Sequence, residues 1–483
     1  MNGADDSAIN GDERLRVAVL GAGPGGYPAA FLAAERGLSV TLIDKAPQPG
    51  GVCLYEGCIP SKALLHVAKL LRETEEAASW GISFGSPKIE LDELRAWKDA
   101  TIRKMTGGLH LLRRQHNVRY AQGTGRIRDA TRLNVEHAGE VLEIEYDALI
   151  VATGSSPAIP PPLQIDSELV MDSTSALSLP EIPDTLLVVG GGYIGLELGT
   201  VYAALGAQVT VVEMLPQILT GVERELVRVL ERSLRSRLKA IHVNTSVVSV
   251  EEATGGVCVT LRDADGVERV ESYDRVLVAT GRRPNSVGLG LERTQAHVDG
   301  RGFIETDRQR RTAEPAVFAI GDVAGEPMLA HKATHEASVA VGAICDEPTT
   351  FEPLAVPAVI FTDPEIAWCG LSESEAAALD IDATTVSFPW GALGRASASG
   401  RNDGLTRLVI ERDTERVLGV QVVGAGAGEL IGEGVLAVEL GARAADLAES
   451  IHAHPTLSES LMEAAEVFYG RSPHYLSRRS TLR

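Results

Sequence analysis

Residues 16–26, Arg-Val-Ala-Val-Leu-Gly-Ala-Gly-Pro-Gly-Gly, decide the fold of this chain. The first five of them form a short buried-strand pattern and lead into a glycine-rich turn. A predicted helix then reaches Arg36, and a second predicted strand, residues 39–43, ends at Asp44. This order is the pattern of a dinucleotide-binding unit: a strand, a G-x-G-x-x-G turn, a helix, and a second strand that ends in an acid.

The three glycines of this turn have separate physical roles. Gly21 makes the tight turn, Gly23 lets the backbone approach a pyrophosphate, and Gly26 allows the helix to pack closely on the strand. Asp44, eighteen residues after Gly26, can accept hydrogen bonds from a ribose. A G-x-G-x-x-G turn alone is weak evidence, so the prediction rests on both strands and the terminal acid together.

The same pattern occurs a second time. A predicted strand, residues 186–189, leads into the turn 190–195, a helix that reaches Leu205, and a strand, residues 208–212, that ends at Glu213. The glycines at the fingerprint positions are Gly190, Gly192 and Gly195. Both dinucleotides are expected at the carboxyl ends of their strands. The chain is therefore predicted to be an α/β protein with two Rossmann-like dinucleotide-binding domains.

Between the two fingerprints lies a pair of cysteines, Cys53 and Cys58, directly before an apolar-periodic run. A regular helix would hold their Cα atoms roughly 8.5 Å apart, whereas a disulfide needs less than about 7 Å. We therefore expect the segment to bend at the start of its helix, which Gly57 and Pro60 permit. The pair is typical of a redox-active disulfide; the spacing alone also allows a structural disulfide or two unrelated thiols. A zinc site is disfavoured because no second cysteine pair exists to complete it.

Composition limits the function classes. At 483 residues the chain is too long for one core and suggests three or four structural units. The formal net charge of −21 argues against nucleic acid as a partner, because phosphate binding needs a basic surface. The other cysteines, Cys258, Cys345 and Cys369, are scattered and expected to be buried thiols, which indicates a reducing compartment.

No membrane span or targeting signal is predicted. The sequence has no run of 18 or more apolar residues. Residues 1–14 form an acidic polar lead-in, and we expect a disordered tail, since transit peptides are poor in acid and rich in arginine. A cytoplasmic protein of bacterial type is expected.

From about residue 14 to about residue 470 the chain resembles the flavoprotein disulfide reductases, the class I pyridine nucleotide-disulfide oxidoreductases, and within them most the dihydrolipoamide dehydrogenases. The resemblance rests on residues 50–62 around the cysteine pair, Ala152-Thr153-Gly154, residues 279–285 (Ala-Thr-Gly-Arg-Arg-Pro-Asn), residues 319–322 (Ala-Ile-Gly-Asp) with 328–332 (Met-Leu-Ala-His-Lys), and residues 452–459 (His-Ala-His-Pro-Thr-Leu-Ser-Glu). The chain departs from the family at Asp44, where Glu is usual, and at Tyr55-Glu56, which replaces Asn-Val.

The resemblance implies a domain order. After the tail, residues 15–155 would form the first segment of an FAD-binding domain with the redox disulfide, and residues 156–282 an NAD-binding domain. Residues 283–350 would return to the FAD-binding, central domain, and residues 351–483 would form a C-terminal α+β dimerisation domain. In the last of these, strands are expected at 356–361 and 417–423 and helices at 428–440 and 456–469.

The resemblance also implies the catalytic residues at the disulfide. Cys53 and Cys58 would be the redox pair, with Cys58 nearer the flavin. Lys62, four residues after Cys58, would pair with Glu197 beside the flavin ring, since a buried lysine without a partner is costly. Without the motif, each of these two charged residues would be interpreted as part of a solvated helix face.

A base for the substrate thiol is implied near the C-terminus. His454 would take the proton, oriented by Glu459, because an imidazole held by a carboxylate works near neutral pH. His452 would support them. From the residues alone, His-x-His with a later acid could also be a metal site or a polar surface loop; the resemblance implies no metal.

FAD and NAD are the cofactors that the resemblance implies. The residues expected to hold them are Gly21, Gly23, Gly26, Asp44, Gly51, Lys62, Gly154, Gly190, Gly192, Gly195, Glu213, Gly281, Asp322, Met328, Ala330 and His331, with Asp322 at the ribityl chain. The expected partners are a second copy of the chain, as a homodimer, and the lipoyl domain of a 2-oxoacid dehydrogenase acyltransferase.

Two alternative functions within the family, and one from a different class, are compatible with the fold. A glutathione reductase would want basic residues where this chain has Glu213, and a mercuric reductase would want a C-terminal cysteine pair, which residues 471–483 lack. A non-catalytic interaction subunit is disfavoured because the cysteine pair, His454 and Glu459 are intact.

Overall fold

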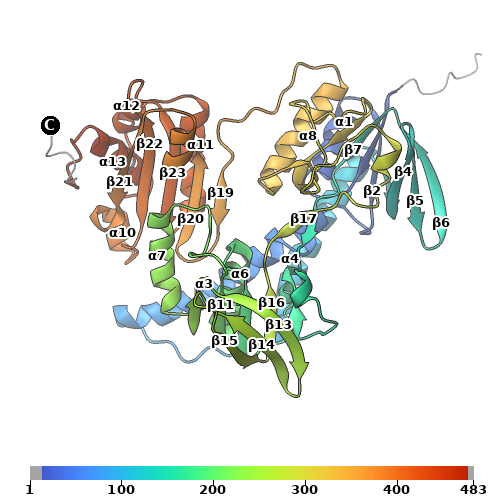
Figure 1. Cartoon of the computed structure of the whole chain (residues 1–483). Coiled ribbons are helices and arrows are strands. Elements are labelled where there is room, and N and C mark those ends of the chain that lie inside the picture. The colour runs from blue at the N-terminus through green and yellow to red at the C-terminus, as the bar shows by residue number, and fades with distance from the viewer. Residues whose placement is uncertain (1–13, 477–483) are drawn as a thin grey trace, which may run out of the picture. The chain divides into compact units, whose positions relative to one another are not determined.

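In the computed structural model, which describes residues 14–476, the first fingerprint lies in a five-stranded parallel sheet with the order β18-β7-β1-β2-β3. Its strands are β1 (Arg16–Leu20), β2 (Ser39–Asp44), β3 (Arg119–Gln122), β7 (Ala148–Val151) and β18 (Val317–Ala319). Helices α1 (Gly26–Glu35) and α8 (Ala330–Ile344) pack together against this sheet (Figure 1). A separate antiparallel sheet consists of β4 (Thr124–Asp129), β5 (Arg132–His137) and β6 (Glu140–Glu145).

The sheet is buried on both faces, which explains its apolar strands. Val17 and Val19 of β1 pack into a core with α1 and α8, whereas Ala18 and Leu20 pack into a second core with strands β4 to β6. Because successive side chains of a strand point to opposite faces, both sets of residues must be apolar.

The second fingerprint lies in another five-stranded parallel sheet, with the order β12-β11-β10-β16-β9. Its strands are β9 (Val170–Met171), β10 (Thr185–Val189), β11 (Gln208–Val212), β12 (Ala240–His242) and β16 (Arg275–Val278). Helices α5 (Ser173–Ser178), α6 (Tyr193–Leu205) and α7 (Arg224–Arg235) accompany it, with an antiparallel sheet of β13 (Ser246–Ala253), β14 (Gly256–Arg262) and β15 (Glu268–Tyr273).

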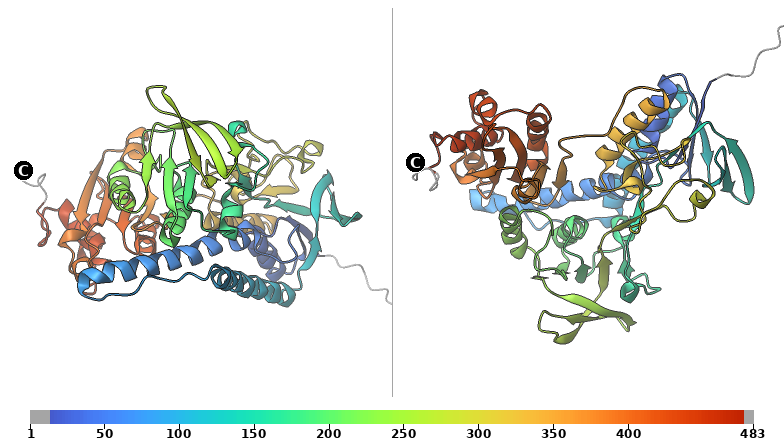
Figure 2. Two further views of the ribbon diagram at one scale, coloured as in Figure 1. Left: turned by 90° about the horizontal axis from the view of Figure 1, so that it is seen from below. Right: turned by 45° about the horizontal axis from the view of Figure 1, so that its top comes forward.

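The C-terminal residues form an antiparallel sheet with the order β19-β20-β23-β22-β21, shown from two sides in Figure 2. Its strands are β19 (Ala358–Ile360), β20 (Glu365–Gly370), β21 (Ala383–Pro389), β22 (Leu405–Glu411) and β23 (Val417–Gly424). Its helices are α9 (Glu373–Ala378), α10 (Gly394–Ala398), α11 (Ala427–Glu439), α12 (Ala444–Glu449) and α13 (Glu459–Phe468). The core of this part contains the fully buried Trp390 and Phe388.

Two further helices, α2 (Gly51–Tyr55) and α3 (Cys58–Glu76), carry the cysteine pair. Helix α4 spans Leu91–Gln115, and β8 (Ser155–Pro157) and β17 (Arg282–Pro284) form a two-stranded sheet. By contacts the described chain divides into two units. The first contains residues up to Ile59, Asp99–Ser156 and Arg282–Glu352; the second contains Pro60–Lys98, Pro157–Gly281 and the residues from Pro353 onward.

The structure corrects the predicted ends of two elements. The strand predicted at 356–361 is the shorter β19, because Pro357 has no N–H for the ladder and the N–H of Phe361 donates to Glu197 instead. The helix predicted from residue 456 begins at Glu459, because the Thr456 N–H bonds the Glu459 carboxylate in a turn. Apart from Arg14, the expected acidic tail lies outside the described residues.

The prediction that the scattered cysteines are buried is confirmed only for Cys369, which is 1% exposed. Burial raises the pKa of its thiol to about 12. Cys258 and Cys345 are only half-buried, because Cys258 points away from the core-facing Val257 and Val259 of β14, and Cys345 follows the last turn of α8. None of the helices in residues 14–476 has the length and hydropathy of a membrane span.

Candidate functional site

The first fingerprint is a close-packed turn. An added Cβ at Gly21 would overlap the carbonyl oxygen of Ala152, and one at Gly26 would overlap that of Gly21. Asp44, at the end of β2, accepts the Ala22 N–H at 2.6 Å on Oδ2. Only glycine therefore fits the turn, and the acid is held against it.

The second fingerprint repeats this construction. An added Cβ at Gly190 would overlap the Ala279 carbonyl, and one at Gly195 would overlap the Gly190 carbonyl. Glu213 directly follows β11, and its Oε2 accepts the Gly191 N–H at 2.8 Å. In each fingerprint a backbone N–H of the glycine turn thus donates to the acid at the end of the second strand, and the sequence did not predict these hydrogen bonds. They fix each carboxylate where a ribose is expected.

Both turns also leave room for a ligand. Added Cβ atoms at Gly192, Gly154 and Gly281 would meet no atom within 4 Å, and one at Gly23 would meet only the Gly51 Cα at 3.8 Å. Gly192 stands directly before α6, so the open space lies at a helix N-terminus, where phosphates bind well. The residues present therefore fit a dinucleotide at each turn.

The cysteine segment lies against the first fingerprint. The Gly50 N–H donates to the Ala22 carbonyl at 2.9 Å, and an added Cβ at Gly51 would overlap the Gly23 Cα. Cys53, in α2, is therefore held next to the first dinucleotide turn.

The predicted bend between the cysteines is present. Helix α2 ends at Tyr55 and α3 begins at Cys58. Gly57 folds back so closely that an added Cβ would lie 3.3 Å from the Cys53 Cα. Cys53 is half-buried and Cys58 is exposed at the first position of α3, so both thiols can take part in exchange chemistry.

The expected ribityl ligand, Asp322, lies in a turn after β18 that buried charges hold in place. Its Oδ2 accepts the Ser155 hydroxyl at 2.5 Å. The neighbouring Gly321 N–H donates to Glu336 at 2.6 Å, and Glu336, 0% exposed, lies 3.1 Å from both Lys332 and Arg310. The remaining expected flavin ligands stand before and at the start of α8: Met328 and Ala330 are half-buried and His331 is exposed.

The second unit contains the ion pair that the resemblance implied. Lys62 Nζ lies 2.8 Å from Glu197 Oε2, and Glu197 is 4% exposed on α6. Phe361 completes the arrangement: its N–H donates to Glu197 Oε1 at 2.9 Å, and Lys62 Nζ lies over its ring, 4.5 Å from the ring centroid. Both charges are therefore held on two sides.

His454 and Glu459 form the second predicted pair. His454 Nδ1 lies 2.8 Å from Glu459 Oε1, and the Thr456 N–H donates to Oε2 at 2.7 Å. Burial alone would raise the pKa of Glu459, but these hydrogen bonds outweigh it and hold the pKa below its ordinary value. The His454 side chain is 71% exposed, so its Nε2 is accessible. His452 has both nitrogens bonded, to the Ser450 carbonyl and to Glu433, and supports the turn.

Sequence reasoning missed two residues of these arrangements. Phe361 acts through its backbone N–H, which any residue provides, so no side-chain pattern signals it. Glu336 does have a signal, because it lies four residues after Lys332 on one helix and can form an i,i+4 pair.

Residues 15–337 match the family described as pyridine nucleotide-disulphide oxidoreductase, and residues 356–465 match its dimerisation domain. The chain is 43% identical over 457 residues to a dihydrolipoyl dehydrogenase of Vibrio parahaemolyticus, with 95% of this chain and 96% of the relative covered. It is 42% identical over 465 residues to a dihydrolipoyl dehydrogenase of Halobacterium salinarum, with 96% and 98% covered.

Solved structures agree in fold. The crystal structure of LpdA from Mycobacterium tuberculosis has a TM-score of 0.87 at 32% identity, with 94% of this chain and 99% of that chain covered. The flavoprotein disulfide reductase RclA from Escherichia coli has a TM-score of 0.84 at 24% identity, with 94% and 100% covered, and shares the fold. The chain belongs to the pyridine nucleotide-disulphide oxidoreductase family.

Proposed function

We propose that this protein is a dihydrolipoyl dehydrogenase, which oxidises protein-bound dihydrolipoamide to lipoamide and reduces NAD. The observation that carries the proposal is the similarity to dihydrolipoyl dehydrogenases over 95% of the chain. The geometry supports it, because the two glycine turns fit two dinucleotides and a pair of thiols lies against the first.

The chain supplies placement and electrostatics for two cofactors. Gly21, Gly23, Gly26, Asp44, Gly51, Gly154, Asp322, Met328, Ala330 and His331 would hold FAD, and Gly190, Gly192, Gly195, Glu213 and Gly281 would hold NAD. When bound, FAD takes the electron pair from the dithiol and delivers it as hydride to NAD. The Lys62–Glu197 pair would place one fixed positive charge beside the flavin.

Sulfur exchange transfers the electron pair from the substrate to the cysteine pair. His454, oriented by Glu459, takes a proton from dihydrolipoamide, and the resulting thiolate attacks the Cys53 sulfur of a Cys53–Cys58 disulfide. Cys58 leaves as a thiolate. The second substrate sulfur then attacks the first and breaks the mixed disulfide; its proton passes to the released Cys53 sulfur, and lipoamide leaves as a cyclic disulfide. The substrate loses two electrons and two protons, and the cysteine pair gains the two electrons.

The dimerisation domain supports a homodimer. We infer that each active site combines Cys53 of one subunit with His454 of the partner subunit, because His454 lies inside the residues that match the dimerisation domain. The exposed imidazole would then face a substrate that enters between subunits. The proposed donor is the lipoyl group on the acyltransferase of a 2-oxoacid dehydrogenase complex.

A steady-state comparison tests the proposal. Purified enzyme should reduce NAD with dihydrolipoamide and should show little turnover with NADPH and glutathione disulfide. A preference for the second pair of substrates would replace the proposal with a glutathione reductase.

A further inference from the structure

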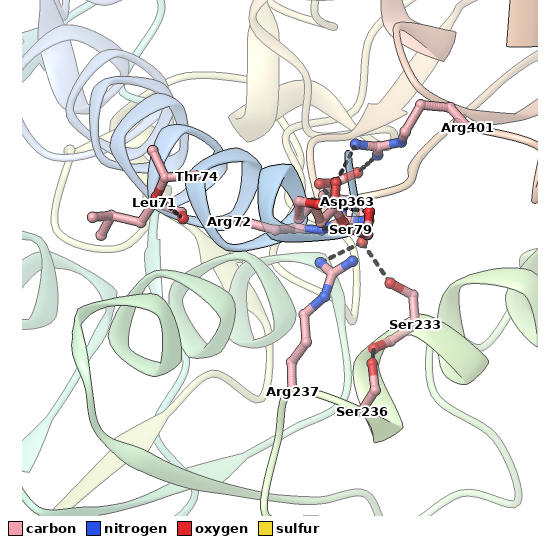
Figure 3. A network of polar contacts seen from close by, with 10 residues as sticks. Leu71, Arg72, Thr74, Ser79, Ser233, Ser236, Arg237, Asp363 and Arg401 are labelled. Carbon is pink, nitrogen blue, oxygen red and sulfur yellow. Dashed lines mark hydrogen bonds and ion pairs between the residues drawn. The ribbon is translucent and has the colours of Figure 1, made fainter. Parts of the chain in front are cut away.

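Asp363 lies in the loop between β19 and β20 and is held from three other parts of the second unit. Its carboxylate forms ion pairs with Arg72 of α3 and with Arg401, which precedes β22. Its carbonyl oxygen accepts the Ser233 hydroxyl at 2.9 Å and Arg237 Nη1 at 2.7 Å, at the C-terminal end of α7 (Figure 3). Asp363 is therefore fixed from α3, from α7 and from the residues before β22.

The same loop carries the residue that holds the Lys62–Glu197 pair. Phe361, two positions before Asp363, donates its N–H to Glu197 and places its ring under Lys62. Thr362 between them is 2% exposed, so the loop has little freedom to move one end without the other. A displacement at Asp363 would therefore change both contacts of Phe361.

The loop borders a cavity on one side. A cavity of about 810 Å³ lies between α3, α7 and the loop, and Phe361, Asp363, Arg72 and Arg237 line it. Burial and the nearby Arg72 guanidinium lower the pKa of Arg237 to about 10. The charged guanidinium of Arg237 therefore needs nearby carboxylates to offset the cost of its burial. Ile360 and Phe361 belong to or pack against the apolar core of the second unit, whereas Asp363 is held by its hydrogen bonds and ion pairs.

We propose that Asp363 is a positioning residue for the Lys62–Glu197 pair. Its arginines and Ser233 hold the loop, the loop holds Phe361, and Phe361 orients the two charges. The inference rests on the proposed function, in which this pair lies beside the flavin, and it assigns Asp363 control over the flavin's midpoint potential and reactivity.

The test measures the two-electron midpoint potential of the bound flavin in purified holoenzyme by equilibration with a reference dye. Asp363→Asn keeps the backbone carbonyl and the shape of the side chain but removes the charge. We expect its midpoint to shift in the same direction as in Lys62→Met and by less, with turnover lowered about threefold or more, as for one member of a coupled network. Asp363→Glu should restore most of the wild-type midpoint.

A matched control separates positioning from a general change of charge. Asp403 interacts electrostatically with Arg72 and Arg237 but is exposed and lies outside the loop. Asp403→Asn should keep the wild-type midpoint. If Asp363→Asn does not fold, Arg401→Gln removes one arm of the network and should give a smaller shift in the same direction.

A double variant decides whether Asp363 acts through the pair. In the Lys62→Met background, Asp363→Asn should add almost no further shift. A shift that persists there, an equal shift in Asp403→Asn, or a lowered Tm with an unchanged midpoint would each overturn the proposal. If Lys62→Met itself leaves the midpoint unchanged, the assignment of the pair to the flavin fails as well, whereas the dihydrolipoamide assay on the wild type tests the activity independently.

Discussion

Substituting Glu213 should change which pyridine nucleotide the enzyme uses. Two backbone donors fix its carboxylate at the end of β11: the Gly191 N–H at 2.8 Å and the Leu215 N–H at 2.9 Å. In this fold, an acid at that place accepts hydrogen bonds from the ribose hydroxyls of NAD. The 2′-phosphate of NADP would bring like charge to the same place.

The size of the discrimination follows from this geometry. Two unit charges about 4 Å apart interact by about 4 kcal/mol at an effective dielectric constant of about 20. Glu213 is half-buried, so solvent ions screen part of the repulsion, and about 3 kcal/mol remains as the expected cost of the like-charge contact. Residues 214–216, Met-Leu-Pro, provide no adjacent cation. This cost corresponds to roughly a hundredfold in kcat/KM.

The assay compares kcat/KM for NAD and NADP in the wild type and in Glu213→Gln. The amide keeps an acceptor for Gly191 and removes the charge, so the preference for NAD should fall by about tenfold or more. The matched control is Asp44→Asn in the first fingerprint, which should weaken flavin retention and leave the NAD preference unchanged. Wild-type enzyme that uses both nucleotides equally, or a control that shifts the preference as much as Glu213→Gln does, would refute the reasoning.

Three further predictions concern the two cysteines, the shared active site and the Glu459 carboxylate. In the two-electron-reduced enzyme, Cys58→Ser should abolish the long-wavelength thiolate-to-flavin absorption band, whereas Cys53→Ser should show the band without added reductant; identical spectra would mean that the two sulfurs are wrongly assigned. Mixing inactive Cys53→Ser and His454→Ala subunits should recover activity in heterodimers, and no recovery after verified subunit exchange would exclude a shared site. The pKa of Glu459 is lower in the folded protein than its ordinary value, so the charged carboxylate stabilises the fold at a pH above the ordinary glutamate pKa. This stabilisation is lost as the pH falls through the folded pKa, and the Tm difference between wild type and Glu459→Gln should therefore shrink in that range. A Tm difference that does not change with pH would contradict the pairing.

Much of the nucleotide-binding architecture can be predicted from the sequence. The strands β1 and β11 lie where their apolar runs predict them, because parallel strands buried on both faces have continuous apolar patterns. The bend before Cys58 follows from covalent geometry, since a regular helix would hold the cysteines too far apart for a disulfide.

The contacts that arrange the charged groups could not be predicted in this way. Phe361 holds Glu197 through its backbone N–H, and the Asp363 carbonyl is bonded from α7, more than a hundred residues earlier in the chain. Such contacts depend on where separate elements lie in three dimensions, and no local residue pattern records them. The start of α13 differs from the prediction for a local reason, because the Glu459 carboxylate accepts the Thr456 N–H and bonds His454 in a turn that precedes the helix.

Thiol labelling tests the central claim most directly. The purified enzyme is incubated anaerobically with dihydrolipoamide, with or without NAD, then unfolded, alkylated and analysed by mass spectrometry. The account predicts that Cys53 and Cys58 are protected as a disulfide in the oxidised enzyme, that dihydrolipoamide makes both of them alkylatable, and that excess NAD restores their protection. Labelling of the pair that dihydrolipoamide does not change, or that NAD does not reverse, would contradict it.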